Sequence, residues 1–403
     1  MISDSATDFP PLRLRKNEER RLRAGHLWVY SNEVDIDATP LKAFEPGQAV
    51  TIEAHNGKAL GTGYVNPHSL ICARLVSRDP AHPLNPSLLV HRLNVALSLR
   101  ERLYSTPYYR LVYGEADGLP GLIVDRYGEI CSAQLTTAGM ERLKEAVLAA
   151  LTKVLKPTAV LWRNDSSVRT LEGLPNYVET AFGQVPETVQ LEENGVTFQA
   201  PLATGQKTGW FFDQQDNRAR MLKYVRGRRV LDVFSYLGAW GLQALVHGAR
   251  EAWCVDSSAR ALEILRTNAA LNRIAERVNI VQGDAFAVLK SLREAREHFD
   301  IVILDPPAFI KRKKDLKEGL VAYRRLNEMA LQLLAKDGLL ISCSCSRQLP
   351  EESLQQIMLQ AVRHLDRSMQ LLERGQQAPD HPIHPAIPET AYLKAVFARV
   401  LPA

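Results

Sequence analysis

The sequence predicts an α/β protein in which a doubly wound C-terminal sheet follows an N-terminal β-rich domain and a small α+β middle domain. Three observations predict this. The chain has 403 residues, more than the ~100–200 of an ordinary domain. Short β-type runs fill its beginning, and beyond about Gly227 apolar strands alternate with helical segments. We therefore expect domains at residues 1–80, 81–185 and 186–403.

The first two domains are predicted from local patterns. Pro- and Gly-containing turns separate three β-type runs, at 48–54, 61–66 and 70–76. Apolar residues at helical spacing over 82–104 then begin the middle domain, and turns with paired strands follow over 113–135. An amphipathic helix and one more strand complete it, at 141–155 and 159–165.

The C-terminal domain is predicted from the alternation of strands and helices. The expected strands are 228–235, 252–258, 278–285, 299–307 and 338–346. The expected helices are 241–249, 259–272, 286–295 and a long stretch that ends near Leu334. Apolar strands separated by helices of ~10–15 residues indicate a parallel sheet that is covered on both faces.

Composition favours a cytoplasmic protein. No run of ~18 apolar residues could cross a membrane, and the first residues do not resemble a secretory signal. Five scattered cysteines do not suggest a disulfide framework. The net charge is only +5, but basic residues cluster at 13–23, 215–229 and 311–314. Such clusters either contact nucleic-acid phosphates or form solvated helix faces.

Acidic residues follow four of the predicted strands. Asp232, Asp256, Asp284 and Asp305 stand at strand ends, where doubly wound sheets bind ligands. The turn after Asp232 contains glycines, including Gly238, without the spacing of a dinucleotide-binding loop. Each acid alone could simply cap a helix. The ordered set is more specific, and we expect Asp256 to bind ribose hydroxyls and Asp284 to bind an adenine amino group.

The fifth predicted strand carries two cysteines, Cys343 and Cys345. A metal site would need more Cys or His ligands nearby, so none is expected. We interpret Cys343 as a buried, inert residue and Cys345, nearer the strand end, as a nucleophile. Carbon 5 of a pyrimidine takes a methyl group after a thiolate adds to carbon 6, and Asp305 would hydrogen-bond or protonate the ring.

Motifs along nearly the whole chain resemble the bacterial 23S ribosomal RNA large-subunit cytosine-5 methyltransferases. They are LRLRKNEERRLRAGHLWVYSNEV, GEADGLPGLIVDRYG, KTGWFFDQ, DVFSYLGAWG, GDAF, LDPPAF, SCS and HPAIPETAYLK. The resemblance implies an N-terminal PUA domain, a central α+β domain and a class I methyltransferase domain that uses S-adenosylmethionine. It also implies methyl transfer to carbon 5 of a cytosine in ribosomal RNA, and is compatible with a homodimer.

The resemblance assigns roles to individual residues. Cys345 and Asp305 would be catalytic. The cofactor would lie among Phe211, Asp213, Gln214, Asp232, Phe234, Gly238, Asp256, Asp284 and Asp305. Apart from the resemblance, we expect the basic residues Arg13, Lys16, Arg20 and Lys311 to bind RNA. We also expect Phe309 and Tyr323 to pack against a target base that has left its stack. Related RNA enzymes carry a second cysteine after the Pro of the fourth motif, where this chain has Pro307 and Ala308, so no base for the carbon-5 proton is identified.

Two other functions remain compatible with the sequence. The acid-Pro-Pro turn partly resembles that of enzymes that methylate a base amino group or another substrate, and these need no cysteine. The chain could also be a non-catalytic RNA-binding assembly factor. Cys345 discriminates the cytosine-5 reaction from methylation of an amino group, and RNA binding without methyl incorporation would favour the assembly factor.

Overall fold

The computed structural model describes residues 9–79 and 82–402, which form two compact units. The first unit contains the chain as far as Val189, together with Pro201–Phe212 and Pro379–Thr390. The second contains Gln190–Ala200, Asp213–Ala378 and the chain from Ala391. The expected boundary between residues 80 and 81 lies outside the described residues, and the three-domain division stays a prediction.

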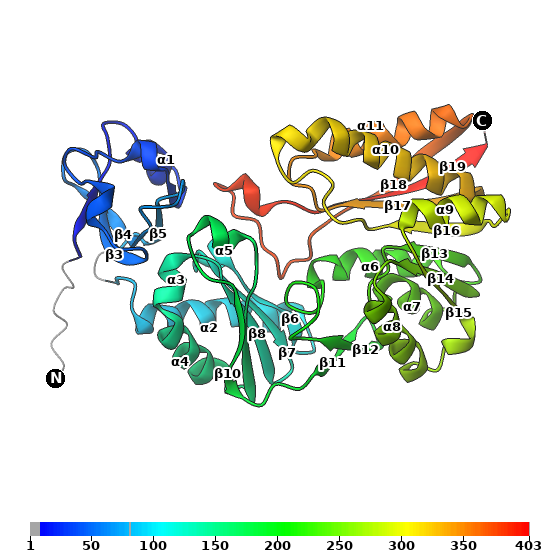
Figure 1. Ribbon diagram of the computed structural model, residues 1–403, viewed down its shortest axis with the longest axis horizontal. Helices are drawn as coiled ribbons and strands as arrows, with labels where there is room; N and C mark the ends of the chain where they lie inside the picture. The colour runs from blue at the N-terminus through cyan, green and yellow to red at the C-terminus, as the bar shows by residue number, and fades with distance from the viewer. Residues whose placement is uncertain (1–8, 80–81, 403) are drawn as a thin grey trace. The chain divides into compact units, whose positions relative to one another are not determined.

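The first unit begins with a small β-rich domain (Figure 1). Its five strands are β1 (Pro11–Arg13), β2 (Trp28–Val29), β3 (Gln48–Glu53), β4 (Ala59–Val65) and β5 (Ala73–Ser77). They lie in the order β1-β3-β4-β5-β2, with a short helix α1 (Glu19–Arg23) beside them. Leu12, Val50, Ile52 and Leu75 are fully buried in its core.

A second five-stranded sheet completes the first unit. Its strands are β6 (Tyr108–Tyr113), β7 (Leu122–Tyr127), β8 (Ile130–Leu135), β9 (Ala159–Asn164) and β10 (Tyr177–Gly183). The helices are α2 (Pro86–Leu103), α3 (Ala138–Arg142), α4 (Lys144–Leu155) and α5 (Val168–Leu171). Helix α2 starts at Pro86, later than the expected segment 82–104, because Asn85 accepts a hydrogen bond from Leu88 N at 2.9 Å and Pro86 fills the first helical position.

A buried carboxylate joins the two sheets of the first unit. Glu172 Oε1 accepts hydrogen bonds from Ser69 Oγ at 3.0 Å and Arg74 Nη1 at 3.1 Å, and Oε2 accepts one from Asn66 Nδ2 at 2.9 Å. Glu172 is 3% exposed, so this charge depends on its partners. The β-rich domain is thereby fixed against the central sheet.

The second unit is built on a seven-stranded sheet. Its strands are β13 (Arg229–Val233), β14 (Glu251–Asp256), β15 (Val278–Gln282), β16 (Phe299–Leu304), β17 (Leu334–Ser344), β18 (Arg367–Gln376) and β19 (Lys394–Pro402). The order is β15-β14-β13-β16-β17-β19-β18. Strands β13 to β17 are parallel, and β19 is antiparallel to both of its neighbours. A separate hairpin pairs β11 (Thr188–Glu193) with β12 (Val196–Pro201).

Helices cover both faces of this sheet (Figure 1). They are α6 (Gln215–Met221), α7 (Ala239–Val246), α8 (Ala259–Leu271), α9 (Ala285–Glu294), α10 (Leu316–Leu333) and α11 (Glu351–His364). The predicted doubly wound α/β class is confirmed. The sequence analysis did not predict α11, β18, β19 or the β11–β12 hairpin. In the two described ranges no helix is long and apolar enough to span a bilayer.

The strand order fixes where a ligand binds. The connections run outward from β13 in one direction and from β16 in the other, so the sheet has its topological switch point between these neighbours. In such sheets, ligands bind beyond the carboxyl ends of the strands at that point. Asp232 lies near the carboxyl end of β13 and Asp305 directly follows β16.

Candidate active site

Asp232 presents a buried carboxylate at the switch point. Its Oδ2 accepts a hydrogen bond from Gly241 N at 2.9 Å, whereas Oδ1 has no partner among the described residues. Burial, reinforced by the nearby acids Asp305 and Asp256, raises the pKa of Asp232 to about 7. A buried oxygen without a donor is suited to a ligand that brings an ammonium or hydroxyl group.

The turn after β13 holds this carboxylate close to helix α7. Phe234 (φ 69°) and Gly238 (φ 84°) have left-handed backbone conformations, and Phe234 N donates to Val255 O at 2.9 Å. At Gly241 a Cβ atom would lie 2.6 Å from Cys254 Sγ. Glycine at that position therefore allows the helix to approach the strands. Both predicted cofactor residues of this turn, Phe234 and Gly238, shape the edge of the site.

Asp256 and Asp284 end the next two strands in different ways. Asp256 is half-buried, and its carboxylate accepts hydrogen bonds from Tyr236 N and Ser258 N, each at 2.9 Å. Asp284 is exposed and accepts one from Ala287 N at 3.0 Å, so it caps α9. The capping role that competed with a ligand role is thus present at Asp284, and its contact with adenine stays a prediction.

Asp305 is held between two donors. Its Oδ1 accepts a hydrogen bond from Gln214 Nε2 at 2.9 Å and its Oδ2 accepts one from Trp240 Nε1 at 3.1 Å. Asn217 Nδ2 donates to Gln214 Oε1 at 2.7 Å, which fixes the orientation of that amide. Burial raises the pKa of Asp305, and the charge of nearby Asp213 adds to the effect. Gln214 and Asp213 therefore lie near Asp305, and their contact with the cofactor stays a prediction.

Cys345 directly follows β17 and lies beside the Asp305-Pro306 turn. Its Sγ is 3.9 Å from Pro306 O, within hydrogen-bonding distance for a thiol. Of the five cysteines, which all lie in the described ranges and are all free, the other four are buried and Cys345 is partly exposed. Cys343 is fully buried, and burial raises its pKa well above the ordinary value for a thiol. The two thiols therefore differ as the sequence analysis expected.

Tyr323 fixes the residues on either side of Cys345. Its hydroxyl lies 2.9 Å from both Ser344 Oγ and Ser346 Oγ, and Ser346 Oγ accepts a hydrogen bond from Ile310 N at 3.1 Å. Tyr323 is fully buried, so the expectation that its ring would pack against a target base is wrong. It is a positioning residue on α10. Phe309 is partly exposed, with its ring centre 4.8 Å from that of Tyr323.

Lys394 is a residue of this site that the sequence analysis missed. It begins β19 opposite Ser344, and its Nζ donates to Ser346 O at 2.7 Å and Tyr392 O at 2.9 Å. Burial lowers the pKa of Lys394 to about 8, while the nearby Cys345 opposes that shift. The available signal was a single lysine that directly precedes the apolar run Ala395–Ala398. To identify Lys394 from the sequence, one would first have to recognise β19 as a strand.

Arg218 is the second missed residue, and it balances the buried acids. Its guanidinium donates to both oxygens of Glu193, at 2.5 and 2.8 Å. Burial acts to lower the pKa of Arg218, but the negative charges of Glu193, Asp213 and Asp305 outweigh it and raise this pKa. Arg218 is 2% exposed. This arginine belongs to the basic cluster 215–229, which the sequence analysis considered for phosphate binding.

Most of that cluster is used in ion pairs instead. Arg229 pairs with Glu251 and Glu297, and both Arg220 and Lys223 pair with Glu373. Charges that are adjacent in sequence are thus balanced by acids from distant segments.

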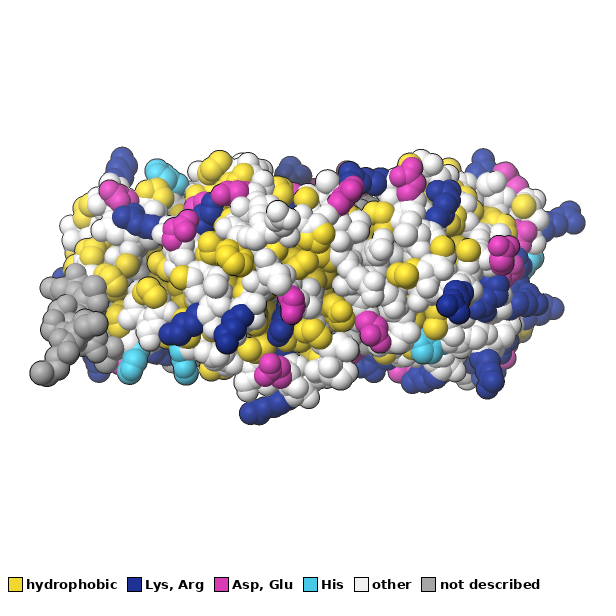
Figure 2. All heavy atoms as spheres, turned by 90° about the horizontal axis from the view of Figure 1, so that it is seen from below, with side chains coloured by type: hydrophobic (Ala, Val, Ile, Leu, Met, Phe, Trp, Pro, Cys, Tyr) yellow, Lys and Arg dark blue, Asp and Glu magenta, His cyan; other side chains and the backbone are white. Residues whose placement is uncertain are grey.

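The predicted RNA-binding residues lie at the surface. Arg13 is partly buried and pairs with Glu53 at 3.0 Å, whereas Lys16, Arg20 and Lys311 are exposed. In the face that Figure 2 shows, Lys and Arg side chains gather toward the right-hand end of the view, with acidic side chains among them. The exposure of basic side chains alone therefore does not identify an RNA-binding surface, and these four assignments stay predictions.

Phe211 belongs to the first unit, unlike the other predicted cofactor residues. Within that unit, Lys207 Nζ lies 4.7 Å from the centre of its ring. Its contact with the cofactor stays a prediction. Within the described ranges, no group of three or more His, Cys, Asp or Glu side chains could hold a metal ion.

Comparison with known proteins places this site in a family. Residues 12–78 match the model of a PUA-like domain, and residues 162–399 match the model of S-adenosylmethionine-dependent methyltransferases. The ribosomal RNA large subunit methyltransferase I of Aliivibrio fischeri is 37% identical over 394 residues, covering 96% of this chain and 98% of that protein. The chain belongs to the ribosomal RNA large subunit methyltransferase I family. The protein of that name from Salmonella arizonae is 35% identical, with full coverage of both chains.

Solved structures agree with the family's fold. A Streptococcus mutans structure described as a SAM-dependent methyltransferase has a TM-score of 0.81 at 21% identity, covering 97% of this chain and all of that one. Another methyltransferase structure, complexed with SAH, has a TM-score of 0.82 at the same identity and coverage. The fold is thus a PUA-like domain with a class I methyltransferase domain. S-adenosylmethionine is the cofactor, and the unpartnered oxygen of Asp232 fits its ammonium and hydroxyl groups.

Proposed function

We propose that this chain transfers a methyl group from S-adenosylmethionine to carbon 5 of a cytosine in large-subunit ribosomal RNA, through an adduct between Cys345 and carbon 6. The single observation that carries the proposal is the position of the Cys345 thiol, partly exposed and 3.9 Å from Pro306 O in the acid-Pro-Pro turn. An enzyme that methylates an exocyclic amine needs that turn and no thiol. The relatives' names, which specify large-subunit ribosomal RNA, support the substrate class.

The nucleophile is supported by its surroundings. Tyr323 fixes the backbone on both sides of Cys345 through Ser344 and Ser346. The Lys394 ammonium is bonded to Ser346 O, directly after the cysteine, and favours the thiolate there because opposite charges stabilise each other in a partly buried site. A fixed and charge-stabilised thiolate is what addition to carbon 6 requires.

Asp305 would stabilise the negative charge that develops on the cytosine ring. When the Cys345 sulfur bonds to carbon 6, negative charge develops on carbon 5 and on the ring. A hydrogen-bond or proton donor at ring nitrogen 3, here Asp305, stabilises that charge. Because burial raises the pKa of Asp305, its protonated form persists to higher pH than that of an ordinary carboxyl. Gln214 and Trp240 keep the carboxyl in one orientation.

The cofactor would be held at the switch point by the strand-end acids. Asp232, Asp256 and Asp284 would bind its polar groups, and the turn from Phe234 to Gly238 would lie beside it. When bound, S-adenosylmethionine supplies an electrophilic methyl group. Loss of the carbon-5 proton to a base and departure of the thiolate from carbon 6 then restore the aromatic ring and free Cys345.

The proposal is tested by replacing the nucleophile. Cys345→Ala should reduce methyl incorporation from labelled S-adenosylmethionine into ribosomal RNA by at least ~10³-fold, since covalent catalysis is lost. Binding of the cofactor should be retained. The matched control is Cys131→Ala, which removes a buried thiol of the first unit and should leave turnover within about twofold.

Nucleoside mass spectrometry of the treated RNA identifies the product. 5-Methylcytidine is the expected nucleoside. Methylation on an exocyclic amine, or full activity of the Cys345→Ala protein, would contradict the proposal. RNA binding without any methyl transfer would instead favour a non-catalytic assembly factor.

A further inference from the structure

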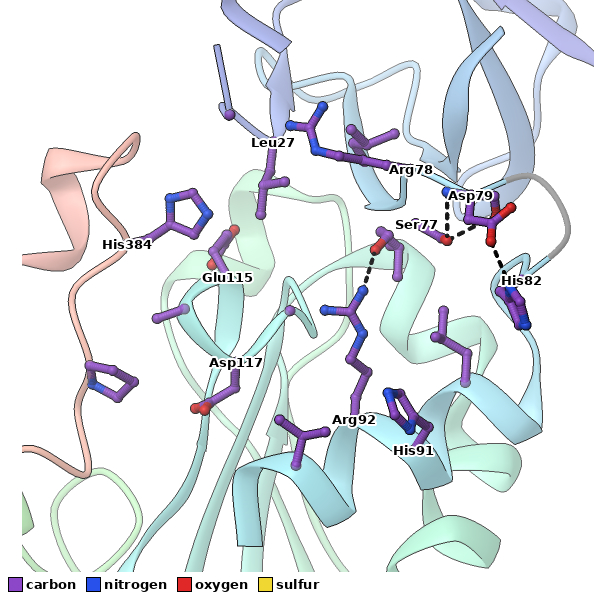
Figure 3. A pocket seen from close by; sticks show the side chains of 18 of the residues that line it. Leu27, Ser77, Arg78, Asp79, His82, His91, Arg92, Glu115, Asp117 and His384 are labelled. Atoms are coloured by element: carbon purple, nitrogen blue, oxygen red, sulfur yellow. Dashed lines mark hydrogen bonds and ion pairs between the residues drawn. The ribbon is translucent and has the colours of Figure 1, made fainter. Parts of the chain in front are cut away.

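A large cavity lies within the first unit. It is bounded by the end of β5, helix α2, the turn Gly114–Asp117 and the segment Pro382–His384 (Figure 3). Its volume is about 1220 Å³, above the ~300–1,000 Å³ of ordinary small-molecule pockets. None of the four predicted RNA-binding residues lines it. The space therefore suits a ligand larger than one metabolite.

Each acidic residue of this cavity has a partner within the first unit. Asp117 accepts two hydrogen bonds from the Arg100 guanidinium, at 2.5 and 2.8 Å. Glu115 accepts one from Trp28 Nε1 at 2.8 Å, and Asp79 lies 2.7 Å from an imidazole nitrogen. Arg100 thus balances Asp117, Arg74 Nε lies 3.8 Å from Glu115, and His82 balances Asp79 only when its imidazole is protonated.

Two arginines in the cavity are not neutralised in this way. Arg78 Nη2 donates to His26 O at 3.2 Å, and Arg92 Nη2 donates to Val76 O at 3.3 Å. In the described ranges neither guanidinium forms an ion pair with a carboxylate. Arg92 projects from α2 and Arg78 approaches from the strand side, so both reach the same space (Figure 3). A pair of uncompensated guanidiniums favours an anionic ligand, above all one with phosphate groups.

An apolar surface lies next to these charges. Leu88, Arg92, Val95 and Leu99 all line the cavity and recur at helical spacing, so they share one face of α2. Val95 is 56% exposed and Leu99 is 38% exposed, so this face of α2 presents apolar surface to the cavity. Apolar surface beside phosphate-binding groups is the combination that single-stranded nucleic acids need, because their bases are unstacked and their backbone is charged.

We propose that this cavity binds a single-stranded segment of the RNA substrate, with Arg78 and Arg92 on its phosphates and the exposed face of α2 against its bases. The inference rests on the proposed function for the identity of the polymer. The size of the cavity favours several linked nucleotides over one. It gives the first unit a contact with RNA that is separate from the predicted RNA-binding residues Arg13, Lys16 and Arg20, none of which lines the cavity.

Fluorescence anisotropy of a labelled single-stranded RNA of about 12 nucleotides with the full-length protein tests the proposal. The double variant Arg78→Gln/Arg92→Gln should bind about tenfold more weakly at low salt. The slope of log K against log salt should fall by about 1.4, since each phosphate contact of a single strand contributes about 0.7. Arg102→Gln is the matched control, because Arg102 is exposed on the same helix and does not line the cavity. A double variant that binds like this control would overturn the proposal.

Further experiments distinguish RNA from mononucleotides and from other polyanions as the ligand of the cavity. Val95→Glu keeps both arginines but places a carboxylate on the apolar face, and it should also weaken RNA binding while thermal unfolding stays unchanged. Uridine monophosphate or polyglutamate should compete poorly with the RNA. If uridine monophosphate competed as well as unlabelled RNA, the cavity would be assigned to mononucleotides. If polyglutamate did so, it would be assigned to polyanions in general. Either result would overturn the proposal.

Failure of the cavity proposal can be distinguished from failure of the proposed catalytic function. If the protein methylates no RNA but the two arginines still govern RNA binding, the cavity assignment stands and the catalytic proposal falls. If Cys345-dependent methylation proceeds and the double variant binds RNA normally, the reverse holds.

Discussion

At the scale of the single residue, the site is dominated by carboxylates that the fold forces into burial. Asp232 is fully buried with one oxygen unpartnered, and its pKa is raised to about 7. Because the folded protein holds this proton where the unfolded chain has released it, Asp232 lowers the free energy of unfolding increasingly as pH rises from about 4 to 7. The fold therefore bears a cost at neutral pH that a cofactor can relieve.

Asp232→Asn should reveal that cost. The amide oxygen can still accept from Gly241 N, and no charge is buried, so we expect the cofactor-free variant to be more stable at pH 8 by on the order of 2 kcal/mol. The advantage should shrink as pH falls toward 4, and affinity for S-adenosylmethionine should drop at least ~10-fold. Urea unfolding across pH and calorimetric titration measure the two effects. A variant less stable than the natural protein at pH 8 would refute the assignment.

Lys394 gives a second residue-scale prediction. Its ammonium favours the Cys345 thiolate, and its pKa of about 8 means that this support disappears as pH rises through that value. At pH 7, Lys394→Gln should slow alkylation of Cys345 by iodoacetamide about fivefold, as expected for a pair interaction of ~1 kcal/mol. The difference should narrow above pH 8. Peptide mass spectrometry reads the rate, with the four buried cysteines as internal controls. Equal rates at pH 7 would exclude the pairing.

At the scale of the element, the closeness of α7 to the sheet depends on Gly241. A Cβ there would lie 2.6 Å from Cys254 Sγ and 3.3 Å from Asp232 Oδ2. Gly241→Ala should therefore destabilise the second unit by about 1–3 kcal/mol. Adding Cys254→Ala removes the closer clash and should recover part of the loss, which a double-mutant cycle in urea would quantify. Strictly additive effects would show that the helix does not touch this thiol.

The elements also show how far the sequence analysis could reach. The strand-end acids and Cys345 were predictable because each follows an apolar strand, and a parallel sheet brings such ends to one edge. Strand β19 was missed because its partners, β17 and β18, lie elsewhere in the chain and the pairing is antiparallel. Lys394 was missed with it. Arg218 looked like one member of a basic cluster, because its partner Glu193 is remote in sequence and only folding brings the two together.

At the scale of the whole molecule, the chain passes repeatedly between its two units. The segment Pro379–Thr390 returns to the first unit, where Asp380 Oδ2 accepts a hydrogen bond from Arg110 N at 2.8 Å and Asp380 O accepts one from Arg100 Nη2 at 2.6 Å. Asp380 is fully buried. A segment late in the sequence is thus part of the packing of helix α2 and strand β6.

Asp380→Ala should loosen the first unit selectively. Leaving Arg110 N without its acceptor costs about 1–3 kcal/mol. Hydrogen exchange at β6 should accelerate while that at β13 stays unchanged, as mass spectrometry of peptides would show. The exposed Asp37→Ala is the control and should stay within ±0.5 kcal/mol. Faster exchange at β13 as well would mean that the two units unfold together.

The placement of β19 has a consequence for how the enzyme is made. Ribosomes deliver a protein in chain order, yet β19 inserts between β17 and β18, both of which are synthesised before it. Until Lys394–Pro402 leaves the exit tunnel, the strand that leads to Cys345 lacks a neighbour and its thiol lacks the lysine beside it. A newly translated chain therefore completes the surroundings of Cys345 only after β19 has emerged and paired.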